Sequence, residues 1–179
     1  FKTNNGRLVY DGGGVDPDFS VERRRFSPVA IGLLSEDLIF RFANEYNDQL
    51  GEIDNPVTYR LPESVFTDFK AWVVDKEFSY SHPLQDEIDQ LRIAAEDVGE
   101  LNRIAAQLGG LEKALTKDVL LDLEKSKAEI MFLLKEEFVT RQFLEPGKIE
   151  VSFSFDKDIQ KAIEVLSSSS TYNQTLSGQ

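Results

Sequence analysis

The chain has 179 residues, of which 41% are hydrophobic, so it can supply the core of one ordinary domain. Its formal net charge is -12, with 32 acidic residues against 20 lysines and arginines, which disfavours binding to nucleic acid or to anionic lipid. No run of about 18 apolar residues is present, and the lack of cysteine excludes disulfides, thiol catalysis and cysteine-bound metals.

The first predicted element is a short strand followed by a glycine-rich turn. Residues 3–10 alternate polar and apolar side chains, a pattern typical of a half-buried strand. Asp11-Gly12-Gly13-Gly14 then permits positive φ angles, and Pro17 sets an extended exit. We therefore expect a short N-terminal β segment that ends in a tight turn.

This stretch resembles the segment that closes the catalytic domain of the C-terminal processing (tail-specific) serine peptidases. The matching residues are Asn5-Gly6-Arg7, Val9-Tyr10, Gly12-Gly13-Gly14-Val15 and Pro17-Asp18. In that family the motif follows the nucleophilic serine and the lysine base, so the resemblance implies that the chemistry lies upstream of Phe1. The chain opens on Phe1 and its only methionine is Met131, and we accordingly expect it to be the rear part of a longer polypeptide.

The resemblance implies a structural role for the motif and no catalytic residue in this chain. For Arg7 two roles stay open, a buried ion pair or a position on the active-site side. The structural family residues are Gly6, Arg7, Gly12, Gly13, Gly14, Pro17 and Asp18.

Two amphipathic helices are predicted next. Ser27 is a plausible N-cap with Pro28 at the first helical position, and Gly51 is a suitable stop. Between them apolar residues recur every four positions, and this helix resembles the one that follows the motif in longer, Bacteroidetes-type members of the family. A second helix starts at Pro62. The apolar side of this helix consists of Val65, Phe66, Phe69, Trp72 and Val73. These residues could line a ligand groove, but their helical spacing favours packing in the core.

Residues 83–143 are predicted to form two long helices that pack as an antiparallel hairpin. In the first helix apolar residues step by three or four positions, and three-residue steps near Val98 resemble a stammer in a heptad pattern. Gly109-Gly110 weakens the helix locally, so we expect a kink or break there.

The C-terminal part is predicted to be helical, with one ambiguous segment. Residues 148–155 alternate like a strand, but the family resemblance favours helix, and helix is weakly preferred. Asp156 then caps a terminal helix, and 171–179 are expected to be a short turn and a frayed tail. The predicted organisation is a peptidase-core remnant over 1–27, an accessory helical domain over 28–166 and a flexible tail over 167–179.

No reactive constellation can be assembled from the sequence. The lysines lie on predicted polar helix faces, no Gly-x-Ser-x-Gly elbow occurs, and the single histidine, His82, is interpreted as an exposed loop residue. Gly12-Gly13-Gly14 is no phosphate loop, because no Lys-Ser/Thr follows it. We therefore predict no catalytic, cofactor-binding or metal-binding residue.

The leading hypothesis is a non-catalytic accessory region of a serine endopeptidase that acts on exported proteins, serving as a scaffold, docking or oligomerisation element. The resemblance implies a periplasmic or envelope location, and protein or peptide substrates held by the upstream domains. Self-association or an envelope protein partner is the further expectation. The alternative is an independent helical interaction module without a protease parent.

Overall fold

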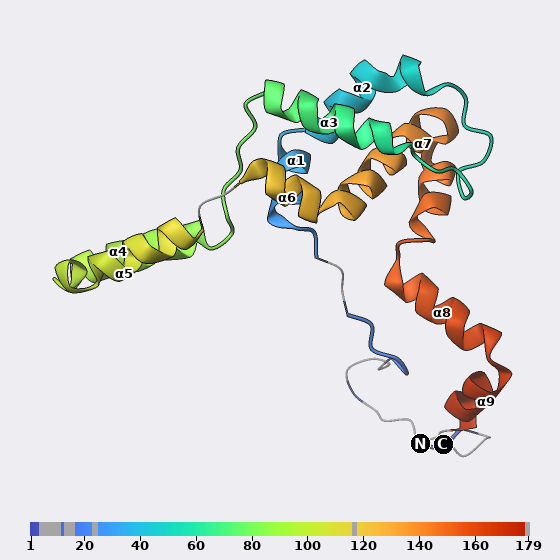
Figure 1. Cartoon of the computed structure of the whole chain (residues 1–179). Helices are drawn as coiled ribbons and strands as arrows, with labels where there is room; N and C mark the ends of the chain where they lie inside the picture. Colours follow the sequence, from blue (N-terminus) through green and yellow to red (C-terminus); the bar gives the residue numbers. More distant parts are fainter. Residues whose placement is uncertain (4–11, 13–16, 23–24, 116–117, 178–179) are drawn as a thin grey trace.

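The computed structural model describes residues 1–3, 12, 17–22, 25–115 and 118–177, and these contain nine helices and no strand (Figure 1). The prediction of a mainly α-helical protein is confirmed, while the predicted strand lies almost wholly outside the described residues. The helices are α1 (Pro28–Ser35), α2 (Leu38–Leu50), α3 (Glu63–Asp75), α4 (Gln85–Asp97), α5 (Leu101–Ala114), α6 (Val119–Lys125), α7 (Lys127–Ser152), α8 (Lys157–Ser167) and α9 (Ser169–Ser177).

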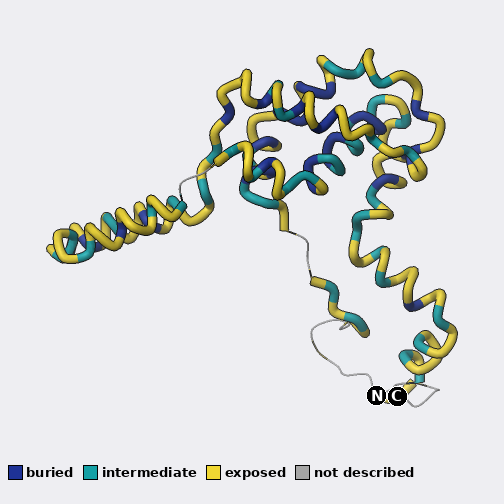
Figure 2. Tube along the Cα trace, in the orientation of Figure 1, coloured by how far each residue is buried: buried dark blue, intermediate teal, exposed yellow. Residues whose placement is uncertain are grey.

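The core lies where α1, α2, α3, α6 and α7 pack together, and the buried residues gather there in Figure 2. Phe66 and Phe69 of α3 and Phe138 of α7 are among its largest fully buried side chains. The pair α4–α5, called the arm below, projects away from this core, and α8 and α9 lead away from it in another direction (Figure 1). The fold is thus a helical body with two extensions.

The predicted helix over 28–50 is two helices, so that expectation was wrong in one respect. The start at Ser27 and the stop at Gly51, where φ is 69°, are confirmed. Between them the chain turns at Asp37, whose φ of 56° is left-handed. The turn allows both Leu33 and Leu38 to be buried, whereas residues of the expected stripe such as Leu34 stay exposed.

The aromatic side of α3 packs into the core, as predicted. Val65, Phe66, Phe69 and Val73 are buried, and the indole N–H of Trp72 donates to the Glu45 carboxylate at 2.7 Å. Burial of the apolar faces and a hydrogen-bonded partner for the indole together account for this packing.

The break in the first long helix lies at a different place from the one predicted. The chain reverses at Gly99, whose φ is 74°, so that α4 and α5 form an antiparallel hairpin within the first predicted helix. The predicted hairpin between two long helices over 83–143 was therefore wrong. Gly109 and Gly110 lie inside α5 without positive φ. A left-handed turn favours glycine, whereas glycine inside a helix costs only about 1 kcal/mol relative to alanine, so a helix can continue through Gly109 and Gly110.

The ambiguous segment is helical up to Ser152, which confirms the preferred interpretation. The second long helix, predicted to end at about residue 143, has a kink at Leu144, where φ is 57°, and then continues as helix. Asp156 caps α8 as predicted, its Oδ1 accepting from the backbone N–H of Asp158 at 2.8 Å. The expected short turn over 171–179 was wrong, because Ser168 Oγ accepts from the Thr171 N–H and starts α9.

Candidate functional site

The predicted family motif is only partly within the described residues. Gly12 has a φ of 106°, which agrees with the expectation that the turn uses left-handed backbone. Pro17 and Asp18 are exposed and lead into the segment that runs beside α8. The remaining motif residues, Gly6, Arg7, Gly13 and Gly14, lie outside the described residues. The structural role assigned to the motif stays a prediction.

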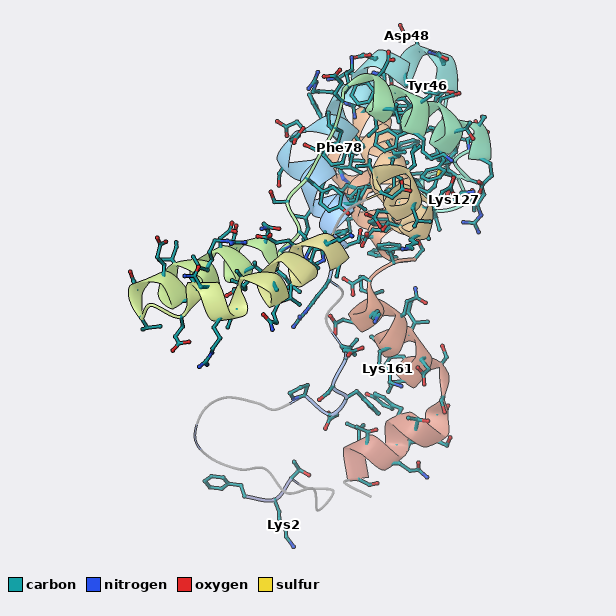
Figure 3. All side chains as sticks on the ribbon, turned by 60° about the vertical axis from the view of Figure 1, so that its left-hand side comes forward. Lys2, Tyr46, Asp48, Phe78, Lys127 and Lys161 are labelled. Atoms are coloured by element: carbon teal, nitrogen blue, oxygen red, sulfur yellow. The ribbon has the colours of Figure 1, made fainter. Side chains whose placement is uncertain are left out.

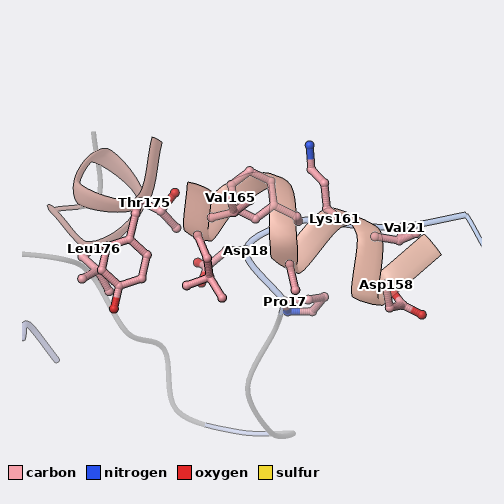
Figure 4. Close-up of a pocket in the computed structure, with 12 residues that line it drawn as sticks. Pro17, Asp18, Val21, Asp158, Lys161, Val165, Thr175 and Leu176 are labelled. Atoms are coloured by element: carbon pink, nitrogen blue, oxygen red, sulfur yellow. The ribbon is translucent and has the colours of Figure 1, made fainter. Parts of the chain in front are cut away.

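A cavity of about 380 Å³ lies between residues 17–21 and the two C-terminal helices (Figure 4). Val165 and Leu166 of α8 and Leu176 of α9 provide apolar walls. The Lys161 ammonium lies 5.2 Å from the centre of the Phe19 ring, a cation–π distance. In Figure 3 Lys161 stands well away from the core residues Tyr46 and Phe78. The connector that follows the motif therefore lies against α8 and α9.

The arm carries the second prominent surface. Leu84, Leu91, Val98 and Leu111 are large apolar residues with exposed fractions of 53%, 49%, 72% and 50%. We call these four residues the arm face. None of them belongs to the hydrophobic core cluster of the described residues, because the core ends where the arm begins.

His82 is half-buried at the base of the arm, so its interpretation as an exposed loop residue was wrong. Its Nδ1 accepts from the Leu84 N–H at 3.1 Å, which positions the chain just before α4. Nearby, the Tyr80 hydroxyl donates to Asp122 at 2.7 Å. Burial, followed by this hydrogen bond, raises the pKa of Tyr80. These contacts join the arm's base to α6 and do not assemble a base with a nucleophile.

One lysine departs from the predicted pattern of exposed, polar helix faces. Partial burial, with the nearby positive charge of Arg60, lowers the pKa of Lys135. Burial raises the pKa of the next residue, Glu136. The Lys148 ammonium lies 3.5 Å from the Glu136 carboxylate, and its positive charge opposes that rise. Lys135 and Glu136 are both half-buried, which the sequence pattern did not reveal.

The described residues contain no cluster of three histidines, cysteines or acidic residues suited to a metal ion. None of the described helices has both the length and the apolar character that crossing a membrane requires. Two features of the described surface stand out, the groove beside α8 and α9 and the arm face.

Comparison with known families gives one match. The model described as "Probable PDZ-protease, C-terminal helical domain" matches residues 29–166, which cover α1 to α8 almost completely. No curated protein and no solved structure matches the chain. The match spans well over half of the sequence and confirms the predicted link to a protease. The chain belongs to the family of C-terminal helical domains of probable PDZ-proteases.

Proposed function

We propose that this domain is the accessory, non-catalytic end of a serine endopeptidase that acts on exported proteins in the periplasm or cell envelope, and that it serves as a docking element. The family match supports the accessory role. The resemblance of residues 3–18 to the closing segment of tail-specific peptidases supports the serine-type chemistry and the location. The catalytic serine and lysine belong to the upstream part of the parent protein.

The observation that carries the docking role is the arm itself. It projects from the body (Figure 1) and contributes no side chain to the core cluster among the described residues. A hairpin that does not support the fold, yet displays several large apolar side chains, has the character of a recognition surface. Replacing it should leave the body folded, which makes the role testable.

The test compares the full-length parent protease with a variant in which residues 85–114 are replaced by a short flexible linker. Cleavage of a short unstructured peptide reports the catalytic centre, and cleavage of casein reports the handling of a protein substrate. We expect the variant to cleave the peptide at the parental rate and to lose most of its activity on casein. The isolated domain should hydrolyse neither.

Three results would contradict the proposal in different ways. Hydrolysis of casein by the isolated domain would refute the non-catalytic role. Equal loss of both activities in the variant would make the arm a scaffold for the catalytic domain. Unchanged activity on both substrates would favour the alternative, an independent helical interaction module whose surfaces do not serve the protease.

A further inference from the structure

The two C-terminal helices contribute little to the core of the helical body. Val165 is the one buried residue of α8, and α9 has none. Within the described residues the hydrophobic core cluster includes no side chain of either helix. Val165 instead shares the cavity of Figure 4 with side chains of the connector (residues 17–22) and of α9. The burial of Val165 therefore follows from packing outside the core.

The connector runs along α8 in the opposite direction to the helix. In Figure 4 Asp18 lies next to Val165, and Val21 lies nearer the first turn of α8. Glu22 lines a further hollow together with Lys157, the first residue of the helix. Six residues of extended chain reach about 20 Å, and the 11 residues of α8 measure about 16 Å. The connector is thus long enough to follow the whole helix.

Alternate side chains of the connector turn toward α8. Phe19 and Val21 are half-buried. The residues beside and between them are exposed, namely Asp18, Ser20 and Glu22. Successive side chains of an extended segment point to opposite sides, so the two apolar residues face the helix, and both line the cavity there. This two-residue period indicates that the connector packs on α8.

The contacts between the connector and α8 are modest. The Lys161 ammonium, placed over the Phe19 ring, is also 2.9 Å from the Glu164 carboxylate, which helps to hold it there. A cation–π contact at a partly exposed site is weak. The cavity of about 380 Å³ stays open beside these side chains, unlike the close packing of a protein interior. The connector is therefore held by contacts that can open.

The base of α8 is fixed to the helical body by other residues. Phe155, just before α8, stacks on Phe132 of α7 with the ring centres 3.5 Å apart and the planes 1° apart. The Asp156 side chain caps the helix by accepting from two backbone N–H groups. Both contacts are made without the connector. The helix can therefore stay folded and in place when the connector leaves it.

We propose that α8 and α9 form a reversible clasp for the connector. When the clasp is closed, it holds residues 17–22 along α8 and sets the direction in which the preceding part of the polypeptide leaves the helical body. When it is open, that part swings freely about the connector. The clasp is a property of this chain. The inference rests on the proposed function in one respect, because the part so positioned is the peptidase domain of the parent.

The test places one spin label on the connector of the full 179-residue chain. The chain contains no cysteine, so Ser20→Cys gives a single labelling site. Ser20 is exposed between two half-buried residues, and a label there reports the motion of the connector without entering the clasp. The shape of the electron paramagnetic resonance spectrum separates slow from fast motion on the nanosecond timescale. We expect a mainly immobile label.

Val165→Asp should convert most of the label to the mobile form, because it places a charge among the apolar walls of the cavity. Ile163→Asp is the matched control. Ile163 is 51% exposed and lies about 200° around α8 from Val165, so the same charge is added on another side of the helix. The spectrum of this variant should equal that of the parent. Circular dichroism verifies that both variants keep their helices.

Phe19→Ala tests the clasp from the connector and leaves every residue of α8 unaltered. It removes the ring that contacts Lys161, so the label should again become mobile. In the full-length parent protease, small-angle X-ray scattering measures the consequence for the preceding domain. Val165→Asp should increase the radius of gyration, because the two domains take up a wider range of orientations, and Ile163→Asp should leave it unchanged.

The inference is overturned if the label is already mobile in the parent chain, if Val165→Asp and Ile163→Asp give the same spectrum, or if Phe19→Ala leaves the label immobile. Equal scattering of the parent protease and its Val165→Asp variant would overturn the role of the clasp in positioning a domain. The proposed function fails separately. A preceding domain without serine peptidase activity would refute it, even where the spin label confirms the clasp.

Discussion

Glu129 of α7 accepts hydrogen bonds from Ser27, a residue 102 positions earlier in the chain. Its Oε2 lies 2.5 Å from the Ser27 hydroxyl and 3.0 Å from the Ser27 N–H. The same hydroxyl accepts from the Ala30 N–H at 3.3 Å, so it caps α1 while it donates to Glu129. Glu129 is only 9% exposed and lies in the first turn of α7, where a negative charge is favourable. One carboxylate thus joins the starts of two core helices.

Glu129→Ala should lower the free energy of unfolding by about 2–3 kcal/mol, because hydrogen bonds to a charged acceptor are lost and the Ser27 N–H is left without an acceptor. Chemical denaturation measures the change. Glu150→Ala, at an exposed site of the same helix, is the control and should stay within about 0.5 kcal/mol of the parent. Equal stability of the two variants would show that the Ser27–Glu129 contact contributes nothing.

Local signals predicted the helices well, whereas long-range packing could not be predicted. Ser27-Pro28, Gly51 and Asp156 mark helix ends through contacts within a few residues, and each lies where expected. The burial of Glu129 depends on a partner 102 residues away, so its sequence neighbours give no sign of it. On a helical pattern alone it resembles the exposed acids around it.

The arm shows the same division. Apolar residues at helical spacing predicted helix in this region, as part of the two long helices expected over 83–143. The three-residue steps near Val98, interpreted as a stammer, lie beside the true reversal at Gly99. The more conspicuous pair Gly109-Gly110 was given greater weight, although glycine is only mildly unfavourable in a helix. Because α4 and α5 project away from the core, the burial of apolar residues in the core could not indicate at which glycine the helix breaks.

Gly109→Ala should stabilise the arm. Gly109 lies in α5 without positive φ, and an added Cβ would meet nothing within 4 Å. Alanine is favoured over glycine in a helix by about 1 kcal/mol. Hydrogen exchange of the α5 amides should therefore slow by up to about fivefold. Exchange in the core helix α2 is the internal control and should not change. Faster exchange in α5 would mean that the glycine serves close packing there.

Gly147→Ala should have the opposite effect. Gly147 is buried just after the kink in α7, and an added Cβ would lie 2.3 Å from Phe143 Cβ and 2.9 Å from Val139 Cγ1. Both neighbours are held within the same helix, so they cannot move aside freely. We expect a loss of about 1–3 kcal/mol in unfolding free energy, the usual cost of overpacking. A thermal midpoint equal to that of the parent would contradict this close approach.

The hydroxyl of Tyr46 on α2 donates to Asp68 Oδ2 on α3 at 2.6 Å, and this contact makes stability depend on pH at the alkaline end. The hydrogen bond to Asp68, then burial and the negative charge of Asp68, raise the pKa of Tyr46 from 10.0 to about 12. Since the folded pKa lies above the unfolded one, the protonated phenol stabilises the fold. That contribution is complete below pH 10.0 and is lost as the pH rises through about 12.

Asp68→Asn removes the negative charge and weakens the acceptor, so the pKa of Tyr46 should fall back toward 10.0. The tyrosinate absorbance of the parent minus that of the Tyr46→Phe variant gives the titration of Tyr46 alone. The same difference measured with Asp68→Asn present in both proteins gives the pKa of Tyr46 without the Asp68 charge. Tyr59 and Tyr80, whose pKa values burial also raises, are unaltered in all four proteins and cancel from the difference. An unchanged Tyr46 titration in Asp68→Asn would mean that burial alone, without the α2–α3 hydrogen bond, raises this pKa.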